Sequence, residues 1–243
     1  MSEQARLPSY EELRRALQPP DFTPETERIY WTINGPLHSS VWIISHDSLK
    51  PYAQGTDESN PTWHPISQCP LTEPKISSIT VEVYELLHWE EDWLTEHRHT
   101  DPPDPEFDEP DAGEGYRFGP LPDCDPDGDW ESLSEERPLH LLECCHTPRP
   151  RGIKTSIVVK PSPGNEFVTI HDYLSTVHAF LLASREDILT SMYVLDPGGR
   201  PAEPKLMVDY NGLSAVMILH EEEDAVRWRS ERRQRPSHLA DDD

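Results

Sequence analysis

The chain has 243 residues, of which 46 are acidic and 21 are Lys or Arg, so its formal net charge is −25. A field of this sign repels phosphate backbones and anionic lipid headgroups, which argues against nucleic acid and membranes as partners. Only 35% of the residues are hydrophobic and 26 are prolines, a composition that predicts a modest core with much irregular chain around it.

Cysteine usage and the N-terminal sequence predict a cytoplasmic or nuclear protein. The four cysteines are too sparse for a secreted disulfide scaffold; they are Cys69, Cys124, Cys144 and Cys145. Residues 1–15 contain no apolar run typical of a signal peptide. Nowhere do about 18 apolar residues follow one another, as a transmembrane helix would require.

The first 87 residues predict a short helix followed by extended chain. Ser9 and Glu12 have the spacing of a capping box, in which each side chain bonds the other residue's backbone N–H. Asn34-Gly35 is a turn signal between two runs of β-forming residues. The expected elements are a helix over 9–17, a hairpin over 28–45, a loop over 50–74 and a strand over 77–87 that continues to Trp89.

An acidic, proline-rich segment interrupts this pattern. Residues 82–136 contain twenty acidic residues and two arginines, a net charge of −18. A segment of this composition cannot bury enough apolar surface to offset the entropy lost on ordering. We therefore interpret 88–149 as an acidic disordered insert.

Regular patterns return after Pro150. Leu174, Val177 and Leu181 recur at helical spacing, which predicts the main helix over 172–183, with Asp172 favourably placed at its N-terminus. The other expected elements are strands over 153–159, 167–170, 206–210 and 214–219, a short helix over 185–191 and a charged helix over 221–235.

These elements predict an α+β fold: a mostly antiparallel sheet with one main helix packed on it, interrupted by a long acidic Pro-rich loop. The chain would then comprise an N-terminal arm with a short helix (1–27), a single α+β domain (28–87 and 150–220), the insert (88–149), and a charged C-terminal helix and tail (221–243).

Two motifs resemble an uncharacterised fungal family, known as a domain of unknown function. They read Val168-Thr169-Ile170-His171-Asp172-Tyr173-Leu174 and Val208-Asp209-Tyr210-Asn211-Gly212-Leu213-Ser214. The resemblance runs from about Ile153 to Leu219. In the family pattern the first motif opens a helix and the second accompanies a strand near the end. The resemblance thus implies elements of the fold and no catalytic residues.

One candidate site is a calcium loop within the acidic segment. Its residues match the start of an EF-hand, with carboxylates at alternating positions and a glycine at the sixth; they are Asp123, Asp125, Asp127, Gly128 and Asp129. Position twelve is Ser134 instead of a bidentate Glu, and Pro126 stiffens the loop. A solvated acidic loop is the alternative.

A second candidate is Cys144-Cys145-His146, because thiolate and imidazole are natural zinc ligands. Possible distant ligands are Cys69, Cys124 and His140. Adjacent cysteines are expected to be poorly placed for two tetrahedral positions, and no C-x-x-C motif is present. The alternative is a strand or loop with half-buried thiols.

A third candidate is a cluster of histidines and carboxylates in 88–101 that could bind a metal. Its members are His88, Glu90, Glu91, Asp92, Glu96, His97, His99 and Asp101. The H-E-x-x-H motif is missing, so the cluster does not predict a metalloprotease.

The C-terminal segment concentrates positive charge, with five arginines between 227 and 235 around Trp228. The alternatives are a solvated helix with i,i+4 ion pairs, a nuclear-localisation signal, and docking of the Arg-rich helix on the acidic insert, within one chain or between two.

Because nucleophile, base and cofactor signatures are missing, the sequence favours a non-enzymatic protein-interaction or scaffold module over an enzyme. Its expected partner is a basic protein segment or its own Arg-rich helix, and its expected cofactor is none, with calcium as an alternative. The competing function is a metal- or thiol-dependent enzyme that uses the cluster at 88–101 or Cys144–His146.

Overall fold

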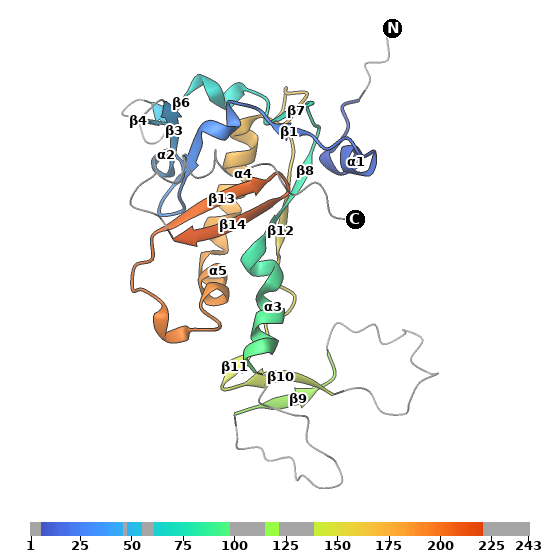
Figure 1. Ribbon diagram of the computed structural model, residues 1–243, viewed down its shortest axis with the longest axis vertical. Helices are drawn as coiled ribbons and strands as arrows, with labels where there is room; N and C mark the ends of the chain where they lie inside the picture. Colours follow the sequence, from blue (N-terminus) through green and yellow to red (C-terminus); the bar gives the residue numbers. More distant parts are fainter. Residues whose placement is uncertain (1–5, 46–47, 55–60, 98–114, 122–138, 221–243) are drawn as a thin grey trace.

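The computed structural model describes residues 6–45, 48–54, 61–97, 115–121 and 139–220 (Figure 1). The expected helix over 221–235 lies outside the described residues. So do 98–114 and 122–138, which make up a large part of the expected acidic insert.

A four-stranded mixed sheet forms the centre of the fold, in the order β12-β8-β14-β13. β8 pairs antiparallel with β12 and parallel with β14, and β13 and β14 form an antiparallel hairpin. The strands are β8 (Ile79–Val83), β12 (Ser156–Val159), β13 (Leu206–Gly212) and β14 (Ala215–His220). With the helices described below, this mostly antiparallel sheet confirms the α+β class.

A second antiparallel sheet continues from the edge of β13. Its strands are β2 (Ile29–Trp31), β3 (Val41–Ser45) and β4 (Ser48–Pro51), in the order β2-β3-β4. Thr32 bridges Met207, and Ile33 N donates to Leu206 O at 3.1 Å. The predicted hairpin over 28–45 is confirmed, although helix α2 (Leu37–Ser40) connects its strands.

The expected loop over 50–74 contains short regular elements instead. They are β5 (Ala53–Gln54), β6 (Thr62–Trp63), the 3-10 helix η2 (Pro65–Gln68) and β7 (Thr72–Glu73), which pairs with β1 (Asp21–Phe22). Tyr52, Ile66 and Leu71 are buried in the main core. Burial of these three side chains holds the segment against the core, although its Pro and Ser content predicted a loop.

Three of the predicted helices are confirmed. They are α1 (Tyr10–Arg15), α4 (Ile170–Ala183) and α5 (Arg185–Met192), and two further short turns are η1 (Thr26–Arg28) and η4 (Pro197–Gly199). Both α1 and α4 begin with a reciprocal capping box. Leu174, Val177 and Leu181 bury the predicted stripe of α4 in the core. Figure 1 shows α4 behind the β13–β14 hairpin.

Helix α3 (Tyr84–Glu96) corrects two predictions. The strand ends at Val83 and does not continue to Trp89, and residues 88–96 are helical, not part of a disordered insert. Leu86 and Trp93 are buried and Trp89 packs beside them. Their spacing places them on one helical face, so the acidic residues can lie on the other faces, where water solvates them.

A small antiparallel sheet also lies within the expected insert. It consists of β9 (Arg117–Gly119), β10 (His140–Cys144) and β11 (Thr147–Pro148), in the order β11-β10-β9. Leu141 and Cys144 pack against Trp93 in a separate apolar cluster. Figure 1 shows α3 extending away from the rest of the fold, with this sheet at its far end. We call α3 and the small sheet the arm.

Ion pairs anchor the arm where the chain returns to the main domain. Arg149 and Arg151 each place a guanidinium nitrogen 2.6 Å from Glu90 Oε1 on α3. Arg149 also donates to Leu141 O at 3.4 Å. Glu90, one of the candidate metal-cluster residues, is therefore part of an ion-pair network.

At the base of the arm, Glu85 is 9% exposed, and its Oε1 accepts a hydrogen bond from Ile218 N at 2.7 Å. The second carboxyl oxygen is buried and has no hydrogen-bond partner among the described residues. Burial therefore raises the pKa of Glu85 from 4.5 to about 7, against the opposing effect of the Ile218 hydrogen bond.

Replacement of Glu85 by Gln is expected to make stability less dependent on pH. Between pH 4.5 and about 7 the folded state holds a proton that the unfolded state has lost, so stability falls as pH rises through this window. At pH 8, Glu85→Gln should therefore be more stable than the parent by roughly 2–3 kcal/mol, and at pH 4.5 the two should converge. Urea unfolding at both pH values measures this, and an equal difference at both would contradict it.

Among the described residues, no helix has both the length and the apolar character needed to cross a bilayer.

Candidate metal centre

Three soft metal ligands converge at the far end of the arm. One ligand atom each from His97, Cys144 and Cys145 lies within 4.8 Å of the other two. His97 directly follows the last residue of α3, Cys144 ends β10, and Cys145 opens the turn into β11. The structure therefore combines members of two candidate sites that the sequence kept apart.

The turn between β10 and β11 explains how adjacent cysteines can face one ion. Cys144 pairs with Thr147, so Cys145 and His146 are the two central residues, with φ of 51° and 62°. Two positive φ values are the signature of a type I′ hairpin. In a continuous strand the two side chains would point to opposite faces, whereas here the two Sγ atoms lie 3.8 Å apart. The expectation that adjacent cysteines are poorly placed is wrong for this pair.

The distance between the sulfur atoms suits zinc. Zn–S bonds of about 2.3 Å at tetrahedral angles separate two sulfurs by about 3.8 Å. The separation in the structure is 3.8 Å, and the imidazole of His97 provides a third ligand on the same side of the hairpin. Two thiolates and an imidazole are donors that bind zinc in preference to calcium or magnesium.

The ring of His97 is held in the orientation that a metal ligand needs. Its Nδ1 lies 2.7 Å from Trp93 O, and because a carbonyl can only accept, Nδ1 carries the proton. In the neutral ring this leaves the lone pair on Nε2, where a metal would bind. The ring also stacks on Trp93 with a centroid distance of 4.2 Å and is 7% exposed. An N–H bonded to a backbone carbonyl is a usual outer contact of zinc-binding histidines.

Thr147 links the helix to the hairpin beside these ligands. Its Oγ1 donates to Cys144 O at 2.7 Å and accepts from Trp93 Nε1 at 3.3 Å. The same oxygen lies 3.3 Å from His97 Nε2. An incoming ion would replace this last contact, while the other two hydrogen bonds would continue to fix the hairpin against α3.

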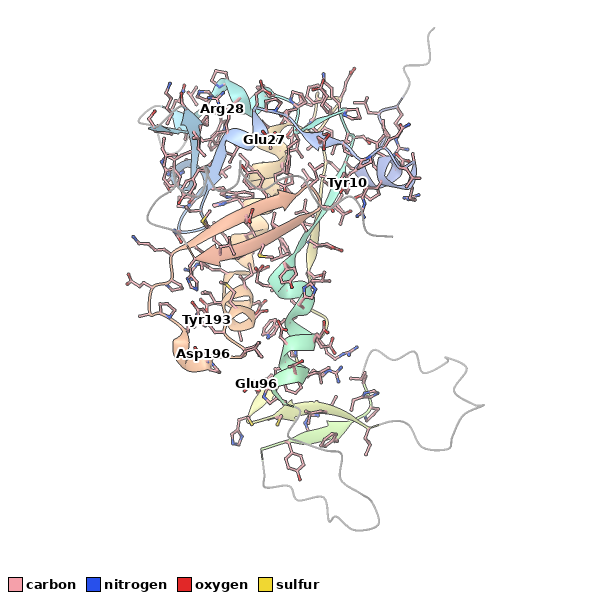
Figure 2. The ribbon with its side chains drawn as sticks, in the orientation of Figure 1. Tyr10, Glu27, Arg28, Glu96, Tyr193 and Asp196 are labelled. Atoms are coloured by element: carbon pink, nitrogen blue, oxygen red, sulfur yellow. The ribbon has the colours of Figure 1, made fainter. Side chains whose placement is uncertain are left out.

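The electrostatics of Cys145 do not suit a free nucleophile. Its hydrogen bond with Cys144 and the negative charge of Glu96 raise the pKa of the Cys145 thiol above its usual value. A nucleophilic cysteine needs the opposite shift, because the thiolate is the reactive form. Figure 2 shows Glu96 at the far end of α3, close to the small sheet. The negative charge around the two thiols would favour the binding of a cation beside them.

The residue types in this turn are not those that favour its backbone conformation. Type I′ turns favour Asn-Gly, since both positions need a left-handed backbone. Cys145 and His146 adopt this conformation without being Gly or Asn, at a cost of about 1–2 kcal/mol each. Keeping a cysteine at a strained position is consistent with a role for its thiol.

His146→Gly is expected to relieve strain and leave metal binding intact. Glycine adopts positive φ without penalty, so hydrogen-exchange protection of 140–148 should rise by about 1 kcal/mol. His146 is not among the three grouped ligands, so zinc stoichiometry should not change. Loss of zinc from a variant that retains its fold would instead make His146 a ligand.

Several predicted site residues lie elsewhere. Cys69 packs against the main core. His140 lies at the opposite end of β10, paired with Gly119. The backbone N–H of His146 donates to Gly115 O at 3.3 Å, and its ring faces Gly115.

The histidine–acid cluster does not form as a unit among the described residues. His88 Nδ1 contacts Tyr84 O at 2.8 Å, and Glu90 is bound by arginines. Glu91 and Asp92 are outside the ligand group as well. Seven predicted site residues lie outside the described residues: His99, Asp101, Asp123, Cys124, Asp125, Asp127 and Asp129.

Sequence reasoning missed the supporting role of Trp93 and Thr147. Trp93 precedes His97 by one helical turn, a spacing that brings its carbonyl and ring to the imidazole once 84–96 is helical. Thr147 has no such signal for its contacts with Trp93 and His97, because these two residues lie 50 and more residues away in the chain.

Comparison with protein-family models, with curated proteins and with solved structures gives no match. The resemblance to a fungal family therefore stays a prediction. In the structure, the first motif contains the Thr169–Asp172 capping box and the second forms part of the β13–β14 hairpin. Both roles are structural.

Proposed function

We propose that the protein is a non-enzymatic protein-interaction module whose arm is fixed by a structural zinc ion bound to His97, Cys144 and Cys145. The observation that supports this function is the convergence of two thiols and an oriented imidazole from chain segments about fifty residues apart. Zinc bound there would tie the hairpin to the end of α3, and so would fix the small sheet relative to the helix.

Cys124 is the fourth ligand in this proposal. It belongs to the segment that joins β9 to β10, and it follows the end of β9 by five residues, a distance of at most about 18 Å in extended chain. A Cys₃His set would close the zinc site, as in structural centres, whereas a catalytic zinc keeps an open position for water.

Two pockets formed by described residues lie away from the proposed zinc ligands. One pocket of the described residues is inside the main core beside Trp31 and Tyr210, and another lies between α1 and β8. Neither adjoins the ligands at the end of the arm. The competing function, a metal- or thiol-dependent enzyme, would need a substrate pocket next to Cys145.

The proposed partner is a basic protein segment. The arm includes residues from the part of the chain that carries a net charge of −18 between 82 and 136, so its field attracts cations and repels nucleic acid and anionic membranes. A cytoplasmic or nuclear location belongs to the same proposal, because free thiols persist in reducing compartments.

Titration of the reduced, metal-free protein with Zn²⁺ and Co²⁺ tests the proposal. We expect one equivalent of tightly bound metal and a cobalt spectrum with sulfur-to-metal charge transfer from three thiolates. A Cys124→Ser variant should lose one third of that charge-transfer intensity. Weak, substoichiometric binding without a thiolate band would rule out the zinc centre, and turnover of a substrate by the zinc form would favour the enzyme.

A further inference from the structure

The extended sheet has a second apolar face, turned away from α4. Along β13, Leu206, Val208 and Tyr210 belong to the main core, whereas Met207 belongs to a separate cluster. This outer cluster consists of the buried residues Tyr30, Ile44 and Met207 with the half-buried Trp42 and Leu219. Because neighbouring residues of a strand alternate between faces, the outer cluster lies on the face opposite the main core.

Further apolar side chains extend this face. Leu49 pairs with Ile44 and is 39% exposed, and Met217 pairs with Asp209 and is 38% exposed. Tyr30 and Trp42 pair across β2 and β3 with their rings 5.9 Å apart. Tyr30, Ile44 and Met207 are at most 3% exposed, so the centre of this apolar face is shielded from water although α4 lies on the other side of the sheet.

The face also carries a buried carboxylate. Asp209 follows Met207 by two positions on β13 and so shares its face, and its side chain is 8% exposed. An occupant that combines apolar side chains with a nearby cation would match both properties of the surface. Figure 1 shows α4 behind the hairpin, on the other side of the sheet from this face.

We propose that this occupant is the chain's own C-terminal segment, residues 221–235. The chain reaches position 220 at the end of β14, within the same sheet. Strands lie about 4.8 Å apart, so crossing β13, β2 and β3 requires about 15 Å, which ten residues span even as a helix. The segment provides Val226 and Trp228 for the apolar surface, while its five arginines are balanced by five acidic residues, so the apolar contact is the main basis of the docking.

Docking of 221–235 would place the Arg-rich segment on the main domain and not on the acidic arm. The energetic reason is that burying Trp228 on an apolar sheet face removes more apolar surface from water than contact with a solvated acidic chain. The sheet would then have cover on both faces, α4 on one and the C-terminal segment on the other.

Methionine oxidation in the full-length protein tests this docking. Dilute hydrogen peroxide oxidises exposed methionines faster than buried ones, and Met217 on the same face is an internal reference. In the parent protein we expect Met207 to be oxidised far more slowly than Met217. In Trp228→Ala, Met207 oxidation should accelerate about tenfold, with Met217 affected less and Met192 unchanged.

A second variant in the same segment serves as the control for Trp228→Ala. Ser230→Ala alters the same segment without changing its aromatic residue or its charge, and it should leave Met207 protected. If Met207 stays protected in Trp228→Ala, segment 221–235 does not cover the face. If protection of Met207 instead rises with protein concentration, and light scattering detects a dimer over the same range, a second copy of the chain covers the face. The intramolecular proposal would then be wrong.

Discussion

Replacing Cys144 by Ser is expected to weaken zinc binding by at least about 100-fold. Loss of a hydrogen bond to a metal ligand typically lowers the metal affinity 10–100-fold. Loss of a thiolate bound directly to the ion should lower it further. Cys145→Ser and His97→Gln should behave alike, since all three belong to one ligand group. Competition with a chromophoric chelator measures each affinity.

The same variants should lose the stabilisation that zinc confers. At a free zinc concentration about 1,000 times Kd, binding stabilises the folded state by about 4 kcal/mol, and hydrogen exchange of the arm should report it. Cys69→Ser is the matched control, because this thiol packs against the main core. Equal zinc affinity in Cys69→Ser and Cys144→Ser would contradict the assignment of the ligands.

Asp172→Ala is expected to destabilise the main domain by about 3–5 kcal/mol, because it removes a buried charge that four donors satisfy. Asp172 is 3% exposed. It accepts from Thr169 N at 2.9 Å and Thr169 Oγ1 at 2.7 Å, and from Ser162 N at 3.1 Å and the Ser162 hydroxyl. The carboxylate thus joins the preceding loop to the first turn of α4.

The pH dependence provides an independent check on Asp172. Burial opposes ionisation, but the hydrogen bonds from Ser162 and Thr169 outweigh it and lower the pKa of the carboxyl. Its contribution to stability is therefore complete above the unfolded pKa near 3.8 and is lost as pH falls through the lower folded value. Urea unfolding at pH 7 measures the main effect. Asp187→Ala, an exposed first-turn position of α5, is the control and should change stability little.

The contrast between α4 and α3 shows what sequence patterns can predict. The helix at 172–183 was predicted because its apolar stripe agrees with the favourable position of Asp172 at its N-terminus. In α3 the apolar spacing of Leu86, Trp89 and Trp93 was present, but the density of acidic residues favoured disorder. Packing against α5, β14 and the small sheet stabilises α3, and none of these contacts is local in sequence.

The candidate site was predictable only in parts. His97 and the Cys144–Cys145 pair were both singled out from residue type, yet they were assigned to separate candidates. Their convergence depends on α3 being helical and on β10 and β11 forming a hairpin. A hairpin with Cys and His at both left-handed positions has no common turn signature, so the sequence could not predict the 3.8 Å approach of the two sulfurs.

The sequence by itself determined the local features: the Ser9–Glu12 capping box, the apolar stripe of α4, the β13–β14 hairpin and the α+β class. Each depends on residues a few positions apart, whose spacing is set by helix or strand geometry. Only the tertiary structure decided the parallel pairing of β8 with β14, the arm and the metal centre. These features bring together distant segments, and their formation depends on burial and packing that local spacing does not encode.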